Sequence, residues 1–298
     1  MHKPGRRNAK GTTSATDDRG PAVPPATAGR PRGVDVGPFP SSRRLVIAAE
    51  RAGRRRAAMH SLVDLDVTTA RNLLDASGRP LSFTAFVVAS VARAAAVHPQ
   101  VHAYRNWRGR LVRHHHVDVT TLVEVATGQG PFALPQVLHD ADIRDVPDLT
   151  AQLRATKGDY AATGTGRMLD RFGTTLTWIP GLVPAMWALL GRSVRLRQLT
   201  GTVAVTAVGM FGAGGGFGIA PLALMPLQVV VGGVTERPRV VDGRIEAREV
   251  VDLTVTLDHN VIDGAPAARF VAELRRLIEN AEVLREPDDT EGHPDRSG

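Results

Sequence analysis

The stretch that decides the fold is His-Asn-Val-Ile-Asp-Gly at residues 259–264. It directly follows the alternating run Val-Asp-Leu-Thr-Val-Thr-Leu at residues 251–257 and directly precedes a helical pattern. Alternation of apolar and polar residues predicts a β-strand, so His259 and Asp263 come at the end of a strand. Gly264 then permits the backbone to turn from the strand into the helix.

His259 is the candidate catalytic residue of this stretch. Imidazole titrates near neutrality, so a histidine held by a strand end can act as general base toward a hydroxyl or a thiol. Asp263 follows four residues later and is expected to support it. The spacing alone is weak evidence, because a histidine near a strand end is more often structural. The wider pattern of the chain strengthens it.

Residues 250–282 resemble the C-terminal end of the acyltransferase catalytic domain of 2-oxo acid dehydrogenase complexes, whose fold is shared with chloramphenicol acetyltransferase. The similar features are a strand, Asp-His, a variable pair, Ile-Asp-Gly-Ala, and a helix containing Ala-Ala-Arg-Phe. Residues 201–212 resemble the family's Gly-Thr-Phe-Thr-Ile-Ser-Asn-Leu-Gly segment, with Thr206 in place of its serine. The resemblance implies that the Thr206 hydroxyl hydrogen-bonds the oxyanion of a tetrahedral intermediate. Without the resemblance, Thr206 is one more polar residue of an alternating strand.

The likeness extends upstream. Residues 81–99 form an apolar helical pattern that stops at its proline, and the family has this helix too, ending in His-Pro. A strand pair at about residues 111–125 and a glycine turn with a strand at residues 126–137 follow. The resemblance therefore implies an α/β (α+β) fold, namely a chloramphenicol acetyltransferase-like mixed β-sheet covered by helices, assembled as trimers.

Three departures from the family concern its contacts. Asn260 stands where the family usually has an arginine, and His102 stands where it has an asparagine after His-Pro. Both positions are candidates for substrate or subunit contacts that differ from the family's. The chain also has no recognisable lipoyl domain, so we expect no covalent lipoyl site on it.

Composition favours one catalytic domain with tails. The 298 residues are 43% hydrophobic and include no cysteine, which excludes disulfides, a thiol nucleophile and thiolate metal ligands and favours a cytoplasmic location. Residues 1–56 carry thirteen Lys and Arg against four Asp and Glu, so the remainder of a chain with net charge +7 is slightly acidic. We expect a disordered basic tail at residues 1–40, the catalytic domain at residues 41–282, and a disordered acidic tail at residues 283–298.

Two segments invite other functions. Residues 43–59 are Arg-rich and helix-compatible, and the resemblance favours a structural or subunit contact there over a nucleic-acid arm, so we expect no specific nucleic-acid partner. In the chloramphenicol acetyltransferase branch an N-terminal arginine pairs with the motif aspartate, which makes Arg43 or Arg44 a candidate partner of Asp263. The apolar insertion at about residues 158–199 is interrupted by prolines and glycine. It predicts a helical lid or a subunit contact, in preference to attachment to a membrane surface.

Two further motifs are weak. Residues 114–116 are three histidines, but neighbours on a strand point to opposite faces, so we expect no metal there. The glycine-rich residues 212–218 lack the Gly-Lys-Ser/Thr ending of a phosphate-binding loop and are expected to be a turn.

These residues together predict a CoA-dependent acyltransferase. His259 would deprotonate the thiol of coenzyme A or of a dihydrolipoyl group, and Thr206 would stabilise the oxyanion. The resemblance implies a site between neighbouring subunits of a homotrimer or a trimer-based assembly, with acyl-CoA as substrate and a lipoyl domain supplied by another protein. A noncatalytic assembly or regulatory subunit is the alternative. A condensation domain of the peptide-synthetase type is disfavoured, because its motif begins His-His and this chain has Asp258 first.

Overall fold

A computed structural model describes residue 33 and residues 41–54, 56–127, 130–158, 181–209 and 214–285. The chain divides into two compact units, Met1–Phe39 and Pro40–Gly298. All the described helices and strands belong to the second unit. The tail predicted at residues 1–40 lies outside the described residues apart from residue 33. Residues 286–298 of the predicted C-terminal tail also lie outside them.

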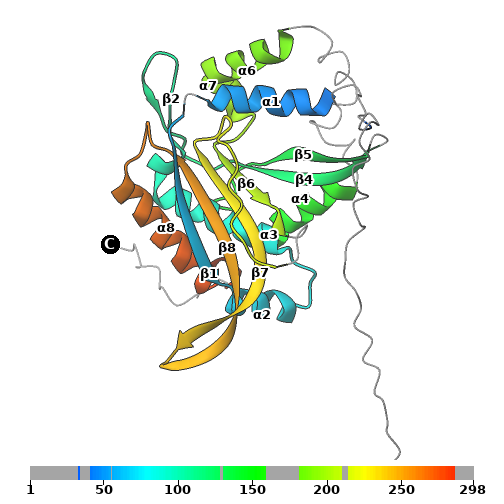
Figure 1. Ribbon diagram of the computed structural model, residues 1–298, viewed down its shortest axis with the longest axis vertical. Helices are drawn as coiled ribbons and strands as arrows, with labels where there is room; N and C mark the ends of the chain where they lie inside the picture. Colours follow the sequence, from blue (N-terminus) through cyan, green and yellow to red (C-terminus); the bar gives the residue numbers. More distant parts are fainter. Residues whose placement is uncertain are drawn as a thin grey trace, which may run out of the picture. The chain divides into compact units, whose positions relative to one another are not determined.

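A six-stranded mixed sheet forms the centre of the second unit, with the strand order β1-β8-β7-β6-β4-β5 (Figure 1). Strand β6 runs parallel to both of its neighbours, and the other neighbouring pairs are antiparallel. The mixed sheet predicted from the sequence is thus confirmed. Its strands are β1 (Ala58–Asp66), β4 (Val119–Thr127), β5 (Gly130–Leu138), β6 (Val203–Ala207), β7 (Leu227–Val241) and β8 (Arg244–Asp258).

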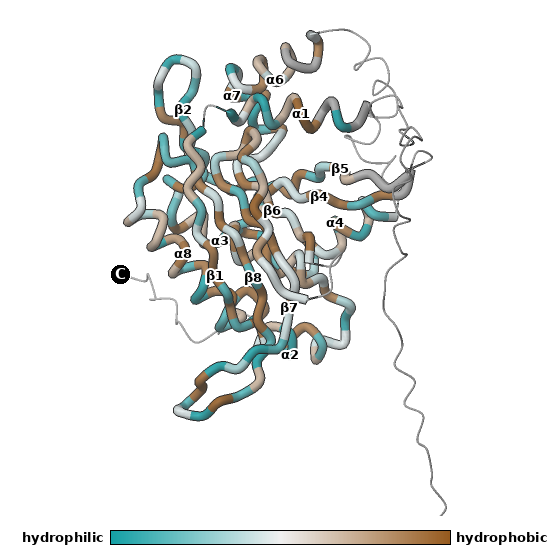
Figure 2. The backbone as a smooth tube through the Cα atoms, in the orientation of Figure 1, coloured by the Kyte–Doolittle hydropathy of each residue, from teal (hydrophilic) through white to brown (hydrophobic). Residues whose placement is uncertain are grey.

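Helices α3 (Phe83–Val97), α4 (Val146–Gly158) and α8 (Gly264–Glu279) cover one face of the sheet. Alternate strand residues point to this helix-covered face, and they form the core with α3: Val203, Val205, Leu227, Val229, Leu253, Val255 and Leu257. Figure 2 shows this hydrophobic layer in brown along the central strands. Helix α3 has the Ser82 hydroxyl as N-cap and stops before its proline, as predicted. The short helix α2 (Thr68–Ala76) contacts α8 and β8.

The opposite face of the sheet, here called the open face, carries the remaining strand residues. On β8 these are Asp252, Thr254, Thr256 and Asp258, all of them buried. Thr254 lies in one row with Leu62 of β1, Val230 of β7 and Thr206 of β6, because each pair of neighbours in that row shares its register. The open-face residues along β8 are therefore polar, whereas the neighbours of Thr254 across the sheet, Leu62 and Val230, are apolar.

Helices α1 (Ser41–Gly53), α6 (Leu182–Arg192) and α7 (Val194–Gln198) form a separate group, in which α1 contacts α6 and α6 contacts α7. The backbone of Leu222 approaches Gly53 so closely that a Cβ there would be 1.8 Å from the Leu222 carbonyl oxygen. Part of the predicted apolar insertion is thus helical, and its residues 159–180 lie outside the described residues. Of the helices that are described, none combines the length and hydropathy that crossing a bilayer requires.

Two hairpins and two short helices complete the described structure. Strands β2 (Tyr104–Arg105) and β3 (Leu111–Val112) pair with each other, so the predicted strand pair at residues 111–125 is instead split between two hairpins. Strands β7 and β8 extend beyond the sheet as an arm that turns at Asp242 and Gly243, both with positive φ. The 3-10 helix η1 (Pro99–His102) follows α3, and η4 (Glu282–Leu284) continues the ordered chain past the predicted boundary at residue 282.

Candidate active site

The turn after β8 is held rigidly by backbone hydrogen bonds. The amide of His259 donates to the Ala57 carbonyl at 2.7 Å, and the amide of Asp258 donates to the Pro226 carbonyl at 3.0 Å. The buried side chain of Ile262 fixes the other end of the turn in the core. The imidazole of His259 is nevertheless 50% exposed, so the turn presents it to solvent from a fixed backbone.

Asp263 accompanies the histidine at longer range. Its Oδ1 lies 4.0 Å from His259 Nδ1, an ion-pair distance rather than a hydrogen bond, and its carboxylate is 89% exposed. Asp263 also precedes α8 as the N-cap residue, without a side-chain cap bond. Gly264 is the first residue of α8, with no left-handed φ and with open space around its absent side chain. The predicted need for a glycine turn at Gly264 is therefore wrong.

Asp258 is the residue that anchors the turn. Arg56 Nη1 donates to its Oδ2 at 2.9 Å, and Asn260 Nδ2 donates to its Oδ1 at 2.9 Å. Asn260, which occupies the position where the resembled family usually has an arginine, thus contributes to holding the turn. The arginine that holds this turn is Arg56, through Asp258, whereas the Arg43 side chain is exposed to solvent and Asp263 pairs with the histidine.

A partly buried arginine and a buried one share one carbonyl beside this anchor. Arg56 Nη2 and Arg197 Nη2 each donate to the Leu224 carbonyl at 2.5 Å. The Arg197 guanidinium also lies 3.6 Å from the centroid of the Tyr104 ring. Burial lowers the pKa of Arg197 to about 10, and the positive charge of Arg56 acts in the same direction. Sequence reasoning missed Arg56 and Arg197, since nothing local marks an arginine as the partner of a carbonyl many residues away.

His102 does not face solvent. It is buried at the end of η1, and its Nδ1 lies 2.9 Å from the hydroxyl oxygen of Thr202, which directly precedes β6. Burial lowers the pKa of His102 to about 4, and the nearby His114 acts in the same direction. The predicted role of His102 in substrate or subunit contacts is wrong for this structure, where it is an internal brace.

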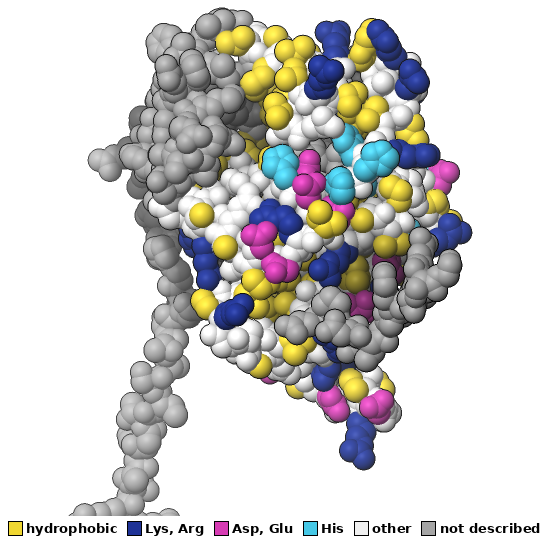
Figure 3. Space-filling view, turned by 180° about the vertical axis from the view of Figure 1, so that it is seen from behind, with side chains coloured by type: hydrophobic (Ala, Val, Ile, Leu, Met, Phe, Trp, Pro, Cys, Tyr) yellow, Lys and Arg dark blue, Asp and Glu magenta, His cyan; other side chains and the backbone are white. Residues whose placement is uncertain are grey.

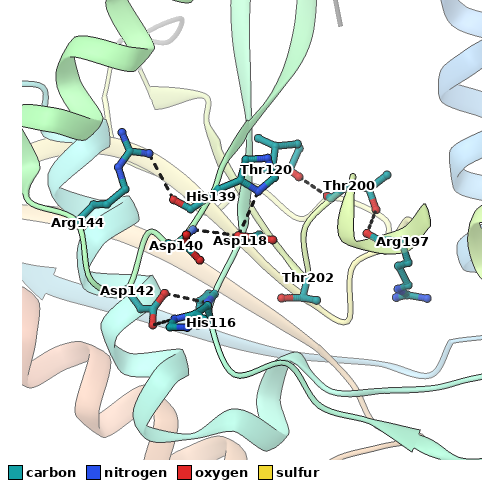
Figure 4. Close-up of polar contacts among 12 residues, drawn as sticks. His116, Asp118, Thr120, His139, Asp140, Asp142, Arg144, Arg197, Thr200 and Thr202 are labelled. Carbon is teal, nitrogen blue, oxygen red and sulfur yellow. Dashed lines mark hydrogen bonds and ion pairs between the residues drawn. The ribbon is translucent and has the colours of Figure 1, made fainter. Parts of the chain in front are cut away.

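The run of three histidines, residues 114–116, lies at the same end of the sheet as His102 but outside any strand. Histidine side chains gather near acidic ones on the surface shown in Figure 3. Figure 4 shows two such pairs, His116 with Asp142 and His139 with Asp118, at 3.6 and 3.3 Å. His114 instead stacks on the Tyr104 ring. Residues 114–116 therefore do not alternate as a strand would, and the described part of the chain contains no group of three metal-ligating side chains.

The glycine-rich loop continues into a segment, residues 214–226 and here called the strap, that crosses the open face. The amide of Gly216 donates to Asp252 Oδ2 at 2.6 Å, and Arg237 Nη1 donates to Asp252 Oδ1 at 2.8 Å. The far end of the strap is bonded to the histidine turn through Leu224 and Pro226. The Gly216 amide therefore serves a carboxylate of the chain itself, in place of a phosphate.

Thr206 lies on the open face of β6 and is partly exposed. Among the contacts between described residues, its hydroxyl makes no hydrogen bond, so it can donate to an external acceptor. Thr206 shares its row with Thr254, which lies two strands away on β8. His259 follows Thr254 by five residues, so Thr206 and His259 are the two residues whose separation matters. At about 3.3 Å per residue and about 4.8 Å per strand, the two residues lie roughly 15–20 Å apart. One chain therefore does not bring Thr206 and His259 together.

Comparisons with known proteins match this geometry. The chain has the same fold as the cubic core of the pyruvate dehydrogenase multienzyme complex, with a TM-score of 0.62 at 17% identity over 89% of this chain and 99% of that one. Azotobacter vinelandii dihydrolipoamide acetyltransferase gives a TM-score of 0.62 at 18% identity, with the same coverage. These likenesses confirm the predicted fold.

Sequence comparisons show similarity to one family over part of the chain. Residues 191–285, which include Thr206 and His259, match the family model of the 2-oxoacid dehydrogenases acyltransferase (catalytic domain). The lipoamide acyltransferase component of the Pseudomonas putida branched-chain alpha-keto acid dehydrogenase complex is 31% identical over 48% of this chain and 37% of its own length. The dihydrolipoyllysine-residue acetyltransferase component of the Corynebacterium glutamicum pyruvate dehydrogenase complex is 25% identical over 80% of this chain and 31% of its own. The predicted resemblance to this family is thus confirmed, and the chain spans about a third of the length of these relatives.

Proposed function

We propose that the protein transfers an acyl group between a coenzyme A or lipoyl thioester and a thiol, with His259 as general base and Thr206 as oxyanion donor. The observation that carries this proposal is the state of the two side chains. The His259 imidazole is half exposed on a fixed turn, and the Thr206 hydroxyl has no partner among the described residues. Both belong to the segment that matches the acyltransferase family.

The proposed reaction begins with proton transfer from the incoming thiol to His259. The thiolate sulfur attacks the thioester carbonyl carbon, and the carbonyl oxygen becomes an oxyanion that accepts a hydrogen bond from Thr206. The intermediate then collapses, the original sulfur leaves, and the imidazolium returns its proton to that sulfur. The exposed carboxylate of Asp263, whose Oδ1 lies 4.0 Å from His259 Nδ1, is the charged group beside the base in this proposal.

The separation of the two residues supports a site shared by neighbouring subunits. We propose a homotrimer or a trimer-based assembly in which one subunit contributes His259 and its neighbour contributes Thr206. Azotobacter vinelandii dihydrolipoamide acetyltransferase has been studied for the role of a serine, a histidine and an asparagine in its mechanism. Thr206, His259 and Asp263 offer a hydroxyl, an imidazole and a side chain shaped like asparagine.

Coenzyme A enters this proposal as a substrate. The proposed acceptor is a lipoyl domain on another protein or a free small thiol. We further propose that the reaction takes place in the cytoplasm. The zero cysteine count leaves no thiol of the chain itself to carry the acyl group, so direct transfer between two substrates is the simplest scheme.

The test is acyl exchange between acyl-CoAs and dihydrolipoamide. We expect His259→Ala to reduce the rate by two or more orders of magnitude, whereas His139→Ala, which removes another exposed histidine, leaves the rate unchanged. Equal rates for the wild type and both variants would show that His259 is not the base. A folded oligomer without activity toward any acyl-CoA would instead favour a noncatalytic assembly subunit.

A further inference from the structure

The immediate surroundings of Thr206 are apolar on every side. On the face of a strand, a residue has two lateral neighbours and two along its own strand. The lateral neighbours of Thr206 are Val230 of β7 and Leu122 of β4, which lies one step beyond the Thr121–Val205 pair that ends the parallel ladder. Its neighbours along the chain are Ala204 and Val208. One hydroxyl thus lies in a square of aliphatic side chains.

Part of this square is uncovered. Val230 is buried, because the strap at Gly218 lies against it and a Cβ there would be 3.0 Å from Val230 Cγ1. A Cβ at Gly218 would also be 3.6 Å from Val208 Cγ2, yet Val208 is 41% exposed, and Leu122 is 47% exposed. The apolar area that remains open therefore lies on two sides of the Thr206 hydroxyl.

Among the described residues of the chain, no cation lies in this square to pair with a charged acyl group. All four neighbours are aliphatic. The cation Arg237 is already paired with Asp252, the next open-face residue along β8 from Thr254. A carboxylate at the end of an acyl chain would lose water here without gaining a partner. An aliphatic chain, in contrast, gains by covering the two exposed side chains.

Resting on the proposed function, we infer that the transferred group is an uncharged aliphatic acyl group longer than acetyl, with Leu122 and Val208 as specificity-determining residues. If Thr206 binds the carbonyl oxygen, the carbon chain begins within a few ångströms of its hydroxyl. Val208 lies two residues from Thr206 along the strand, about 7 Å away. An acetyl group cannot reach that far, whereas a chain of several carbons contacts both Leu122 and Val208.

The experiment compares kcat/KM for acetyl-, butanoyl-, hexanoyl- and succinyl-CoA with dihydrolipoamide as acceptor. We expect kcat/KM to rise about fourfold for each methylene that is buried, which corresponds to about 0.8 kcal/mol, and to be lowest for succinyl-CoA. Leu122→Asp removes the preference for hexanoyl over acetyl. The matched control is Leu62→Asp, since Leu62 lies on the same face in the same row and is 48% exposed, but lies three strands from Thr206.

Three results overturn the inference. The first is a flat or falling series from acetyl to hexanoyl. The second is an equal effect of Leu122→Asp and Leu62→Asp on the hexanoyl-to-acetyl ratio. The third is dissociation of the oligomer by Leu122→Asp, seen by light scattering, which would identify Leu122 as a subunit contact.

Binding separates this inference from the proposed function. If no acyl-CoA is turned over, the proposed function fails, and calorimetric titration with hexanoyl-CoA and unacylated coenzyme A still decides the inference. Tighter binding of hexanoyl-CoA that Leu122→Asp abolishes and Leu62→Asp preserves supports it. Equal binding of the two molecules to the wild type refutes it.

Discussion

Within one chain, Thr206 lies two strands away from His259 and five residues further along the sheet. The rigid hydrogen bonds at the histidine turn and the ladder that holds β6 leave neither residue free to cross that gap. The proposed chemistry needs both residues at a single thioester. Under the proposed function, we therefore expect a second copy of the chain to complete each site.

Mixed oligomers test this arrangement. We expect His259→Ala and Thr206→Val to be inactive alone and to regain about a quarter of the wild-type activity when co-expressed in equal amounts, because random mixing places an intact histidine opposite an intact threonine in about that share of the interfaces. The measurement is acyl exchange by the co-expressed oligomers, purified without selection between mixed and unmixed ones. Mixed oligomers as inactive as the parents would contradict a shared site.

The Thr206 hydroxyl should act only in the transition state. Thr206→Val retains the branched shape but removes the donor, so we expect kcat to fall about 100-fold or more with little change in KM. Thr206→Ser keeps the donor and should retain most of the activity. Steady-state kinetics on both variants checks this, and a serine variant as slow as the valine variant would indicate that packing, not the donor, is what matters.

The Arg56–Asp258 pair should stabilise the fold and position the base. Arg56→Met leaves the nearly buried Asp258 without its cation, which we expect to cost about 3 kcal/mol in the free energy of unfolding. The matched control is Arg51→Met, an exposed arginine near the end of α1, which should change stability little. Urea denaturation followed by circular dichroism measures both, and equal midpoints for the two variants would refute the anchoring role.

His102 should make the protein sensitive to acid. Its pKa falls from an ordinary 6.5 to about 4 in the folded state, so the unfolded chain binds the proton more readily between these values. Stability is thus fully present above pH 6.5 and is lost as the pH falls toward 4. We expect about 2 kcal/mol to be lost between pH 7.5 and pH 5 from this residue.

The check is urea denaturation of the wild type and His102→Asn at both pH values. The variant should lose less stability than the wild type on acidification, even if it is less stable at pH 7.5. Identical losses would mean that His102 protonates alike in the folded and unfolded states.

Local patterns in the sequence were sufficient for the elements that carry the site. The alternating residues of β8 predict a strand, and the apolar residues before Pro99 predict helix α3, because each element buries one periodic set of side chains. The histidine run is different: its residues were expected on a strand, but they lie in the connection between β3 and β4, where His114 packs on Tyr104. Short connections are decided by such tertiary contacts.

The anchoring of the site was beyond sequence reasoning. Arg56 and Asp258 are 202 positions apart, and many arginines near the N-terminus compete as partners on charge alone. Burial selects between them, and burial depends on how the end of α1 meets the strap. His102 was misjudged for the same reason, because a histidine three residues after a proline carries no local sign of the threonine with which it pairs.

The strap is held through its main chain. Its hydrogen bonds to Asp252, Arg56, Arg197 and Asp258 use the Gly216 amide and the Leu224 and Pro226 carbonyls. Between these points, Phe217 and Ile219 project into solvent without a share in the fastening. Replacing Phe217 or Ile219 should therefore change the outer surface of the strap while leaving its main-chain hydrogen bonds in place.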